Sequence, residues 1–184
     1  QSEAKRLQRL VDDLHQLSMS DLGALLHHMD AINLSELLPQ SLKSHERVLA
    51  QQGLVLEFDV APDVVVWGDD DRLCQLIHNL MQNSLRYTDA PGVVRVSLSQ
   101  KQNYAQLVWE DSAPGVPDSS LPLLTERLYR VEQSRNQFSG GSGLGLAIAS
   151  AIAEAHNGEL TANHSALGGL AWTLMLPLCR ANYS

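Results

Sequence analysis

Residues 69–88 read DDDRLCQLIHNLMQNSLRYT and carry the pattern of a single amphipathic helix. Apolar residues recur three and four positions apart, which places them on one side of a helix. That stripe is Leu73, Leu76, Ile77, Leu80 and Ser84. Asp69 is suited to cap the first turn, since a carboxylate accepts hydrogen bonds from the free N–H groups there. We therefore predict a helix over residues 70–88 with its apolar side against a core.

The flanking sequence predicts a sheet that packs against this helix and others. Apolar spacing predicts further helices over 3–28, 34–52 and 142–156. Apolar or alternating runs predict strands over 55–60, 64–67, 94–98, 105–109, 159–163 and 171–176. Residues 112–141 predict a long irregular segment, a kind of loop that usually has a function. The order predicts an α/β fold: a two-layer sandwich with a mixed, mostly antiparallel sheet under helices, and an N-terminal helical appendage.

Composition narrows the classes of protein. The chain has 184 residues, 44% of them apolar, and a net charge of -8. An acidic chain lacks the basic footprint of a nucleic-acid-binding protein, so we expect no direct nucleic-acid contact. No apolar run reaches the length of a membrane span, about 18 residues, and no basic-then-apolar leader is present. Because the chain opens without Met inside a helical pattern, we expect it to be part of a longer protein.

The helix over 70–88 has a second, polar stripe. Its members are Asn79, Asn83, Arg86 and Tyr87, spaced so that they share one side. An amide oxygen can bind Mg²⁺, a guanidinium can bind phosphate, and a phenol ring can stack on a purine. The alternative interpretation is an ordinary solvated helix surface.

Two other segments suggest a nucleotide site. Gly140–Gly145 opens a predicted helix, where glycines and free N–H groups suit phosphate. The loop lacks the Lys of a Walker A motif, and no strand precedes it as in a dinucleotide-binding fold. The segment 110–116 places Asp111 at a strand end, where it could accept a hydrogen bond from an exocyclic amine. A flexible linker and an ordinary turn are the alternative interpretations.

Together these segments resemble the ATP-binding domain of histidine kinases, the Bergerat-type ATP fold. Asn83 and its neighbours resemble the N box, Asp111–Gly115 the G1 box, and Gly141–Leu146 the G2 box. The resemblance extends over residues 34–178 and is closest to BaeS-type envelope-stress sensor kinases. Residues 1–30 resemble the end of the second helix of the dimerisation and phosphotransfer hairpin with its linker, which leaves 31–184 as the catalytic domain.

The resemblance implies ATP and Mg²⁺ as ligands. Asn83 would hold Mg²⁺ and, with Arg86, act in catalysis; Asn79 would support the phosphates and Tyr87 would flank the adenine. Asp111 would accept from the adenine amino group, and Thr173 would help to hold the base. The full set of implied ATP-binding residues is Asn79, Asn83, Arg86, Tyr87, Asp111, Ala113, Gly115, Val116, Tyr129, Arg130, Gly141, Ser142, Gly143, Leu144, Gly145, Leu146 and Thr173.

The sequence departs from the family pattern at two places. Ala113 stands where the G1 box has glycine, and Thr125 and Leu128 stand where the F box has phenylalanines. The methyl group of Ala113 would crowd the base and could weaken binding. A lid with weaker apolar anchoring is expected to move when no nucleotide is bound.

The resemblance also separates kinase from hydrolase. Related ATPases of this fold use a glutamate four residues before the Mg²⁺ asparagine, and here that position is Asn79. An amide cannot act as a general base at neutral pH. The implied activity is therefore phosphoryl transfer from ATP to a histidine, for relay to a response regulator aspartate.

The acceptor histidine is expected outside this chain, on the phosphotransfer hairpin. His45 lies in a segment similar to an acceptor box, but Ala50 replaces the proline of that box, and the segment follows the hairpin's second helix. The implied partners are that hairpin and a cognate response regulator. The implied setting is the cytoplasmic part of a homodimeric inner-membrane sensor, and the fragment alone is expected not to phosphorylate itself.

Two alternative functions stay open at this point. One is a free-standing ATPase or conformational module of the same fold, which would turn over ATP without a protein acceptor. The other is an interaction domain with a degenerate nucleotide site, which would fail to bind adenine nucleotides.

Overall fold

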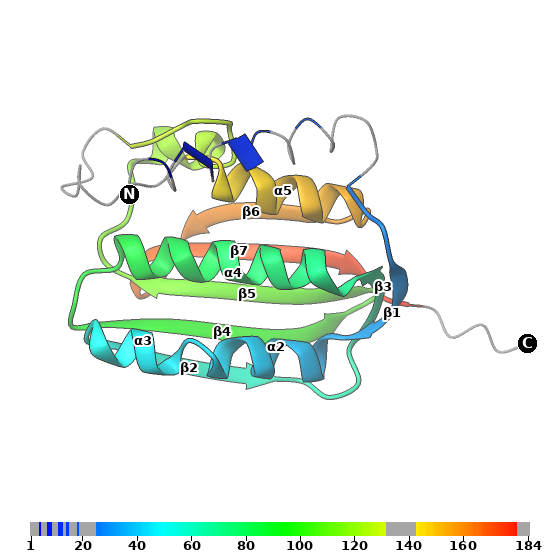
Figure 1. Ribbon diagram of the computed structural model, residues 1–184. Coiled ribbons are helices and arrows are strands. Elements are labelled where there is room, and N and C mark those ends of the chain that lie inside the picture. Colours follow the sequence, from blue (N-terminus) through cyan, green and yellow to red (C-terminus); the bar gives the residue numbers. More distant parts are fainter. Residues whose placement is uncertain are drawn as a thin grey trace, which may run out of the picture.

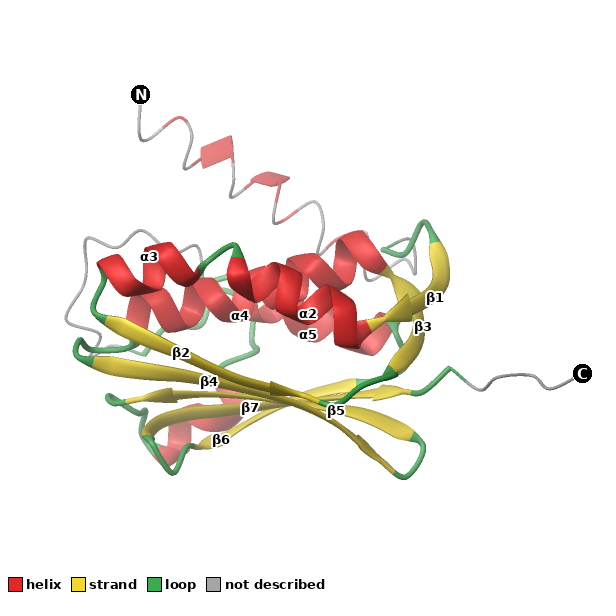
Figure 2. Ribbon diagram, turned by 90° about the horizontal axis from the view of Figure 1, so that it is seen from below, coloured by secondary structure: helices red, strands yellow, loops and turns green. Residues whose placement is uncertain are grey.

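The chain folds into a helical layer on one face of a five-stranded sheet. The computed structural model describes residues 25–131 and 143–179, together with Ala4, Leu7, Gln8, Val11, Asp12, Leu14 and Ser18. Figure 2 shows helices α2 (Leu34–Lys43), α4 (Asp70–Tyr87) and α5 (Gly145–Ala155) on one face of the sheet. The predicted two-layer α/β sandwich is confirmed.

The sheet is mixed and mostly antiparallel. Its strands are β2 (Leu54–Val60), β4 (Gly92–Lys101), β5 (Tyr104–Ser112), β6 (Glu159–His164) and β7 (Gly168–Pro177). They lie in the order β2-β4-β5-β7-β6, as Figure 1 shows. Only the β2–β4 pair is parallel, so the predicted mixed topology and the 94–109 hairpin are confirmed.

The core lies between the helices and the inner face of the sheet. The inward stripe predicted for α4 is buried as expected, and Asp69 caps the helix by accepting a hydrogen bond from the Arg72 backbone N–H. Trp109 of β5 and Trp172 of β7 are among the largest fully buried side chains. Burial of this apolar surface contributes the main stabilising free energy of such a sandwich.

Three helix predictions need correction. The single helix predicted over 34–52 is two helices, α2 and α3 (Glu46–Gln51), which are separated at Ser44 and His45. The helix predicted from Ser142 begins at Gly145. The helix predicted to residue 28 has ended by Leu25, a core residue. None of the described helices is long and apolar enough to cross a bilayer.

A two-stranded sheet joins the N-terminal segment to the domain. Strand β1 (Met29–Asn33), which the sequence did not predict, pairs antiparallel with β3 (Val65–Asp69). One carboxylate oxygen of Asp69 accepts the backbone N–H groups of His27 and His28 at 2.9 and 3.1 Å. The Asp69 N–H donates to Nε2 of buried His156, just after α5. The packed domain therefore begins before residue 31, and Asp69 connects the incoming chain to both α4 and α5.

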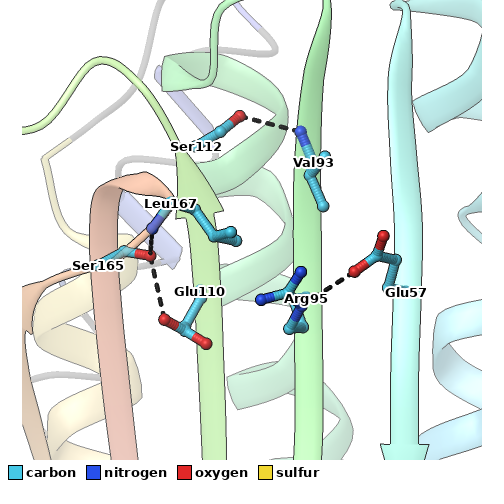
Figure 3. Close-up of polar contacts among 7 residues, drawn as sticks. All are labelled: Glu57, Val93, Arg95, Glu110, Ser112, Ser165 and Leu167. Atoms are coloured by element: carbon cyan, nitrogen blue, oxygen red, sulfur yellow. Dashed lines mark hydrogen bonds and ion pairs between the residues drawn. The ribbon is translucent and has the colours of Figure 1, made fainter.

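The other face of the sheet is polar. In Figure 3 the Arg95 guanidinium points toward Glu57 on the neighbouring strand, and their ion pair measures 2.9 Å. Ser165 donates to Glu110 at 3.1 Å, and the Ser112 hydroxyl accepts the Val93 N–H at 2.9 Å. Both partners of the ion pair are about half exposed, so screening by water and salt leaves it little net effect on stability.

Candidate functional site

Two buried asparagine amides mark the middle of α4. Asn83 is 8% exposed and Asn79 is half-buried. The side-chain Nδ2 atoms of both have no hydrogen-bond partner in the described part of the chain. A buried amide without a partner is costly, so such groups usually have a ligand or water. The arrangement fits a polar ligand that lies against α4.

The beginning of α5 lies beside these amides. A Cβ placed on Gly145 would lie 3.8 Å from the Asn79 side-chain carbonyl carbon and oxygen. The positive end of the α5 dipole is thus next to the amide stripe of α4. Phosphate oxygens are suited to such a place, because the first turn of a helix has backbone N–H groups without an intrahelical acceptor.

The glycine loop is joined to the segment that resembles the F box. Gly143 has φ +71°, a conformation that favours glycine, and its carbonyl oxygen accepts the Leu128 N–H at 3.0 Å. A Cβ on Gly143 would lie 3.2 Å from Leu128 backbone atoms. Tyr129 extends the connection, since its hydroxyl donates to Ser120 at 3.0 Å. The loop before α5 is therefore attached to residues 120–129.

Asp111 ends β5 as a buried carboxylate with two donors. It is 4% exposed. Ser84 of α4 donates its hydroxyl to Oδ2 at 3.0 Å, and the Leu170 N–H donates to Oδ1 at 2.8 Å. Burial raises the pKa of Asp111, and the two hydrogen bonds act in the opposite direction. The group is an oriented carboxylate at the end of the helix–sheet interface.

Gly169 makes the position of Asp111 possible. A Cβ on Gly169 would lie 2.3 Å from Asp111 Oδ1 and 2.4 Å from the Ser112 carbonyl oxygen. No side chain fits there without moving the strand end. This close approach was not predicted from the sequence.

The other predicted residues of α4 lie at its C-terminal end. The Arg86 guanidinium carbon lies 6.0 Å from the centre of the Tyr87 ring, and both residues are half-buried. The chain turns at Ala113, whose carbonyl oxygen accepts the Asp89 N–H at 2.9 Å just after α4. Of the other predicted residues, Gly115 and Arg130 are exposed, and Val116 packs against the core.

The F-box segment and the G2-box segment differ in how their leucines are buried. Leu128 is 60% exposed with φ +64°, so it does not anchor the F-box region in the core. Leu144, just before α5, is fully buried, and Leu146, in the first turn of α5, packs against the core, so these two residues anchor the start of the helix. Gly141, Ser142 and residues 132–140 of the predicted irregular segment lie outside the described residues.

Thr173 is not brought to this group. It pairs with Val108 in the sheet, and its neighbours Trp172 and Leu174 are buried under the helices. Side chains alternate along a strand, so Thr173 points to the opposite, polar face of the sheet. Asp111 points to the helix side, and the predicted base contact of Thr173 therefore does not fit this geometry.

The family model described as "Histidine kinase-, DNA gyrase B-, and HSP90-like ATPase" matches residues 68–180, which include α4, Asp111 and α5. The chain belongs to this ATPase family. Asn83, Asp111 and Gly145 therefore lie within the matched part of an ATPase-family domain.

Relatives with curated names are sensor kinases. The chain is 50% identical over 98% of its length to the signal transduction histidine-protein kinase BaeS of Escherichia coli, of which it covers 38%. It is 36% identical over 95% of its length to the sensor protein SphS of Synechococcus elongatus, of which it covers 44%. The chain thus spans less than half of these relatives.

Solved structures agree on the fold. The mycobacterial sensor histidine kinase MprB matches with a TM-score of 0.69 at 29% identity, over 82% of this chain and 98% of that one. Full-length ShkA in complex with AMPPNP matches with a TM-score of 0.80 at 23% identity, over 98% of this chain and 37% of that one. The second likeness bears on the fold alone.

Proposed function

We propose that this chain is the catalytic part of a two-component sensor histidine kinase, which binds Mg·ATP and transfers its γ-phosphoryl group to a histidine on a separate helical hairpin. The observation that carries the proposal is the partnerless amides of Asn79 and Asn83, beside the N-terminus of α5 and within an ATPase-family domain. The names of the relatives support the kinase assignment over other uses of the fold.

The adenine would lie against Asp111. A carboxylate has about four lone-pair positions, and two of them are taken by Ser84 and Leu170. No other described residue donates a hydrogen bond to Asp111, so the remaining positions would serve the amino group of adenine. Tyr87, which is half-buried, and Val116 would flank the base through apolar contact.

The phosphates would lie between α4 and the loop that opens α5. Arg86 would neutralise phosphate charge, and the N–H groups around Gly143 and Gly145 would donate to phosphate oxygens. The amide oxygen of Asn83 suits Mg²⁺, a hard cation that prefers oxygen ligands. Mg²⁺ bound there would supply charge neutralisation of the phosphates, and Asn79 would support them by its amide donor.

The site is built for transfer and not for hydrolysis. The residue one helical turn before Asn83 is Asn79, which cannot take a proton from water. An imidazole nucleophile needs no such base, because positioning and charge neutralisation carry most of phosphoryl transfer. The hairpin histidine would come from the preceding part of the longer protein, and a response regulator aspartate would receive the group next.

The longer protein would be a homodimeric sensor in the bacterial inner membrane, with this domain in the cytoplasm. That setting rests on the likeness to BaeS. The second candidate function is an interaction domain with a weakened nucleotide site. The observation that favours it is Ala113, whose Cβ lies 3.7 Å from the position that a Cβ on Gly168 would take. An extra methyl group there reduces the room beside the base.

Calorimetric titration with ATP, with and without Mg²⁺, tests the proposal. Wild type is expected to bind ATP more tightly with Mg²⁺ than without it, and Asn83→Ala is expected to lose the difference. Ser97→Ala, a change on the polar face of β4, is the matched control and should bind as wild type does. The absence of binding at millimolar ATP would favour the interaction domain, and turnover to ADP without an acceptor would favour an ATPase.

A further inference from the structure

A buried chain of hydrogen bonds leads from the core to Asp111. The indole Nε1–H of Trp109 donates to the Ser84 hydroxyl at 3.0 Å, and that hydroxyl donates to Asp111 Oδ2 at 3.0 Å. Trp109 and Ser84 are fully buried. Because an indole nitrogen only donates, the hydroxyl must accept from it and direct its own hydrogen toward the carboxylate. The direction of the chain is therefore fixed.

We propose that Ser84 and Trp109 are positioning residues that set the base selectivity of this site, by holding Asp111 as an acceptor for the amino group of a 6-aminopurine. The inference rests on the proposed function, in which Asp111 meets the base. Neither residue was assigned a role at the site from the sequence, where Ser84 counted only as part of the apolar stripe. The proposal concerns selectivity and not the transfer step itself.

Selectivity follows from the protonation state of Asp111. An ionised carboxyl only accepts hydrogen bonds, so it pairs with a 6-amino group and repels a 6-oxo group. A protonated carboxyl donates, and this preference is lost. Burial raises the pKa of Asp111, whereas the Ser84 hydroxyl and the Leu170 N–H favour the charged form. Ser84 therefore helps to keep the acceptor state at neutral pH.

Trp109 gives the hydroxyl its orientation. Without the indole donor, the Ser84 hydroxyl would be free to rotate away from Asp111 Oδ2 toward other acceptors. The two residues come from different layers, since Ser84 is on α4 and Trp109 is on β5. The chain of hydrogen bonds thus holds the carboxylate in register with both the helix and the sheet.

The test compares two nucleotides that differ only in the 6-amino group. ATP and purine riboside triphosphate are titrated into wild type, Ser84→Ala, Trp109→Phe and the control Ser97→Ala at pH 7 and at a series of lower pH values, because burial raises the pKa of Asp111. Wild type should prefer ATP by about tenfold or more, the loss expected for a hydrogen bond to a charged group. Ser84→Ala should reduce this ratio about tenfold at pH 7 and shift the fall of ATP affinity to higher pH, with a smaller effect for Trp109→Phe.

The outcomes separate the inference from the function on which it rests. A Ser84→Ala protein that loses affinity for both nucleotides equally, with an unchanged ratio and pH profile, overturns the positioning role while ATP binding stands. Wild type that binds neither nucleotide overturns the proposed function as well. If Ser84→Ala does not fold, the ratio of the two affinities is measured on Ser84→Cys, whose thiol is a weak hydrogen-bond donor. A ratio equal to that of wild type in both Ser84→Cys and Trp109→Phe also overturns the inference.

Discussion

Replacing Gly169 by alanine tests the geometry around Asp111 most severely. The added Cβ would lie 2.3 Å from Asp111 Oδ1, 2.4 Å from the Ser112 carbonyl oxygen and 2.5 Å from the Asp111 carbonyl oxygen. Two of these three atoms belong to the backbone and cannot rotate away. Either the end of β5 or the start of β7 must move, and the bond from the Leu170 N–H to Asp111 is expected to break.

These contacts determine how much Gly169→Ala lowers the free energy of unfolding. Overpacking of this kind costs about 1–3 kcal/mol. Loss of a hydrogen bond to a buried charged group adds about 1.5–3 kcal/mol. We therefore expect Gly169→Ala to lower the free energy of unfolding by about 3–6 kcal/mol and to weaken ATP binding at least about tenfold.

Urea denaturation and calorimetry measure the two effects. Gly115→Ala is the matched comparison, because its Cβ would approach no atom closer than 3.3 Å and the expected cost is smaller. A Gly169→Ala protein as stable as Gly115→Ala, with wild-type affinity for ATP, would refute the close approach of Asp111 and β7.

Four further predictions concern Asp69, Asp111 and Arg86. Asp69→Ala should lower the free energy of unfolding by about 2–4 kcal/mol in urea denaturation, because it removes a helix cap and leaves the His27 and His28 N–H groups without an acceptor. A decrease below about 0.5 kcal/mol would contradict this prediction. Burial acts to raise the pKa of Asp69, but its backbone donors and the Arg72 charge outweigh burial and lower it, so its contribution to stability is present above about pH 4 and lost as the pH falls further; Asp69→Asn should flatten that acid limb. Because burial raises the pKa of Asp111 and the ionised form binds the base, ATP affinity in calorimetry should begin to fall at a higher pH than the one at which an ordinary aspartate protonates, and an affinity that does not fall on acidification would count against the acceptor role. Arg86→Ala should weaken ATP about 10- to 100-fold and leave adenosine unaffected, and an equal loss for both ligands would exclude a phosphate contact.

The sequence predicted the elements whose patterns are local. Helix α4 carries its cap at Asp69 and an unbroken apolar stripe, and the 94–109 hairpin alternates cleanly, so both were predicted close to their observed bounds. The break at Ser44 and His45 was missed, because both flanking segments have helical patterns; at the break the Ser44 hydroxyl donates to the Ser41 carbonyl oxygen. Strand β1 was missed because its ladder with β3 pairs residues that are more than 30 positions apart in the sequence.

The site shows the same division between local and long-range information. Asn79 and Asn83 were predicted as site residues from their spacing on one helix. The Ser84 and Gly169 contacts with Asp111 were missed, because they join three elements that are distant in sequence. One signal was present for Ser84, a hydroxyl on an otherwise apolar stripe, which needs a partner when buried. Thr173 could have been set aside, because the parity of the strand that buries Trp172 turns it to the opposite face.

Transfer of the γ-phosphoryl group tests the central claim most directly. The chain is incubated with γ-labelled Mg·ATP, alone and with a separately supplied phosphotransfer hairpin that carries its histidine. We predict acid-labile label on the hairpin, little label on the chain itself, and no label on the hairpin when Asn83→Ala replaces the wild type. Stoichiometric acid-labile label on this chain without the hairpin, or equal transfer by Asn83→Ala, would contradict the account.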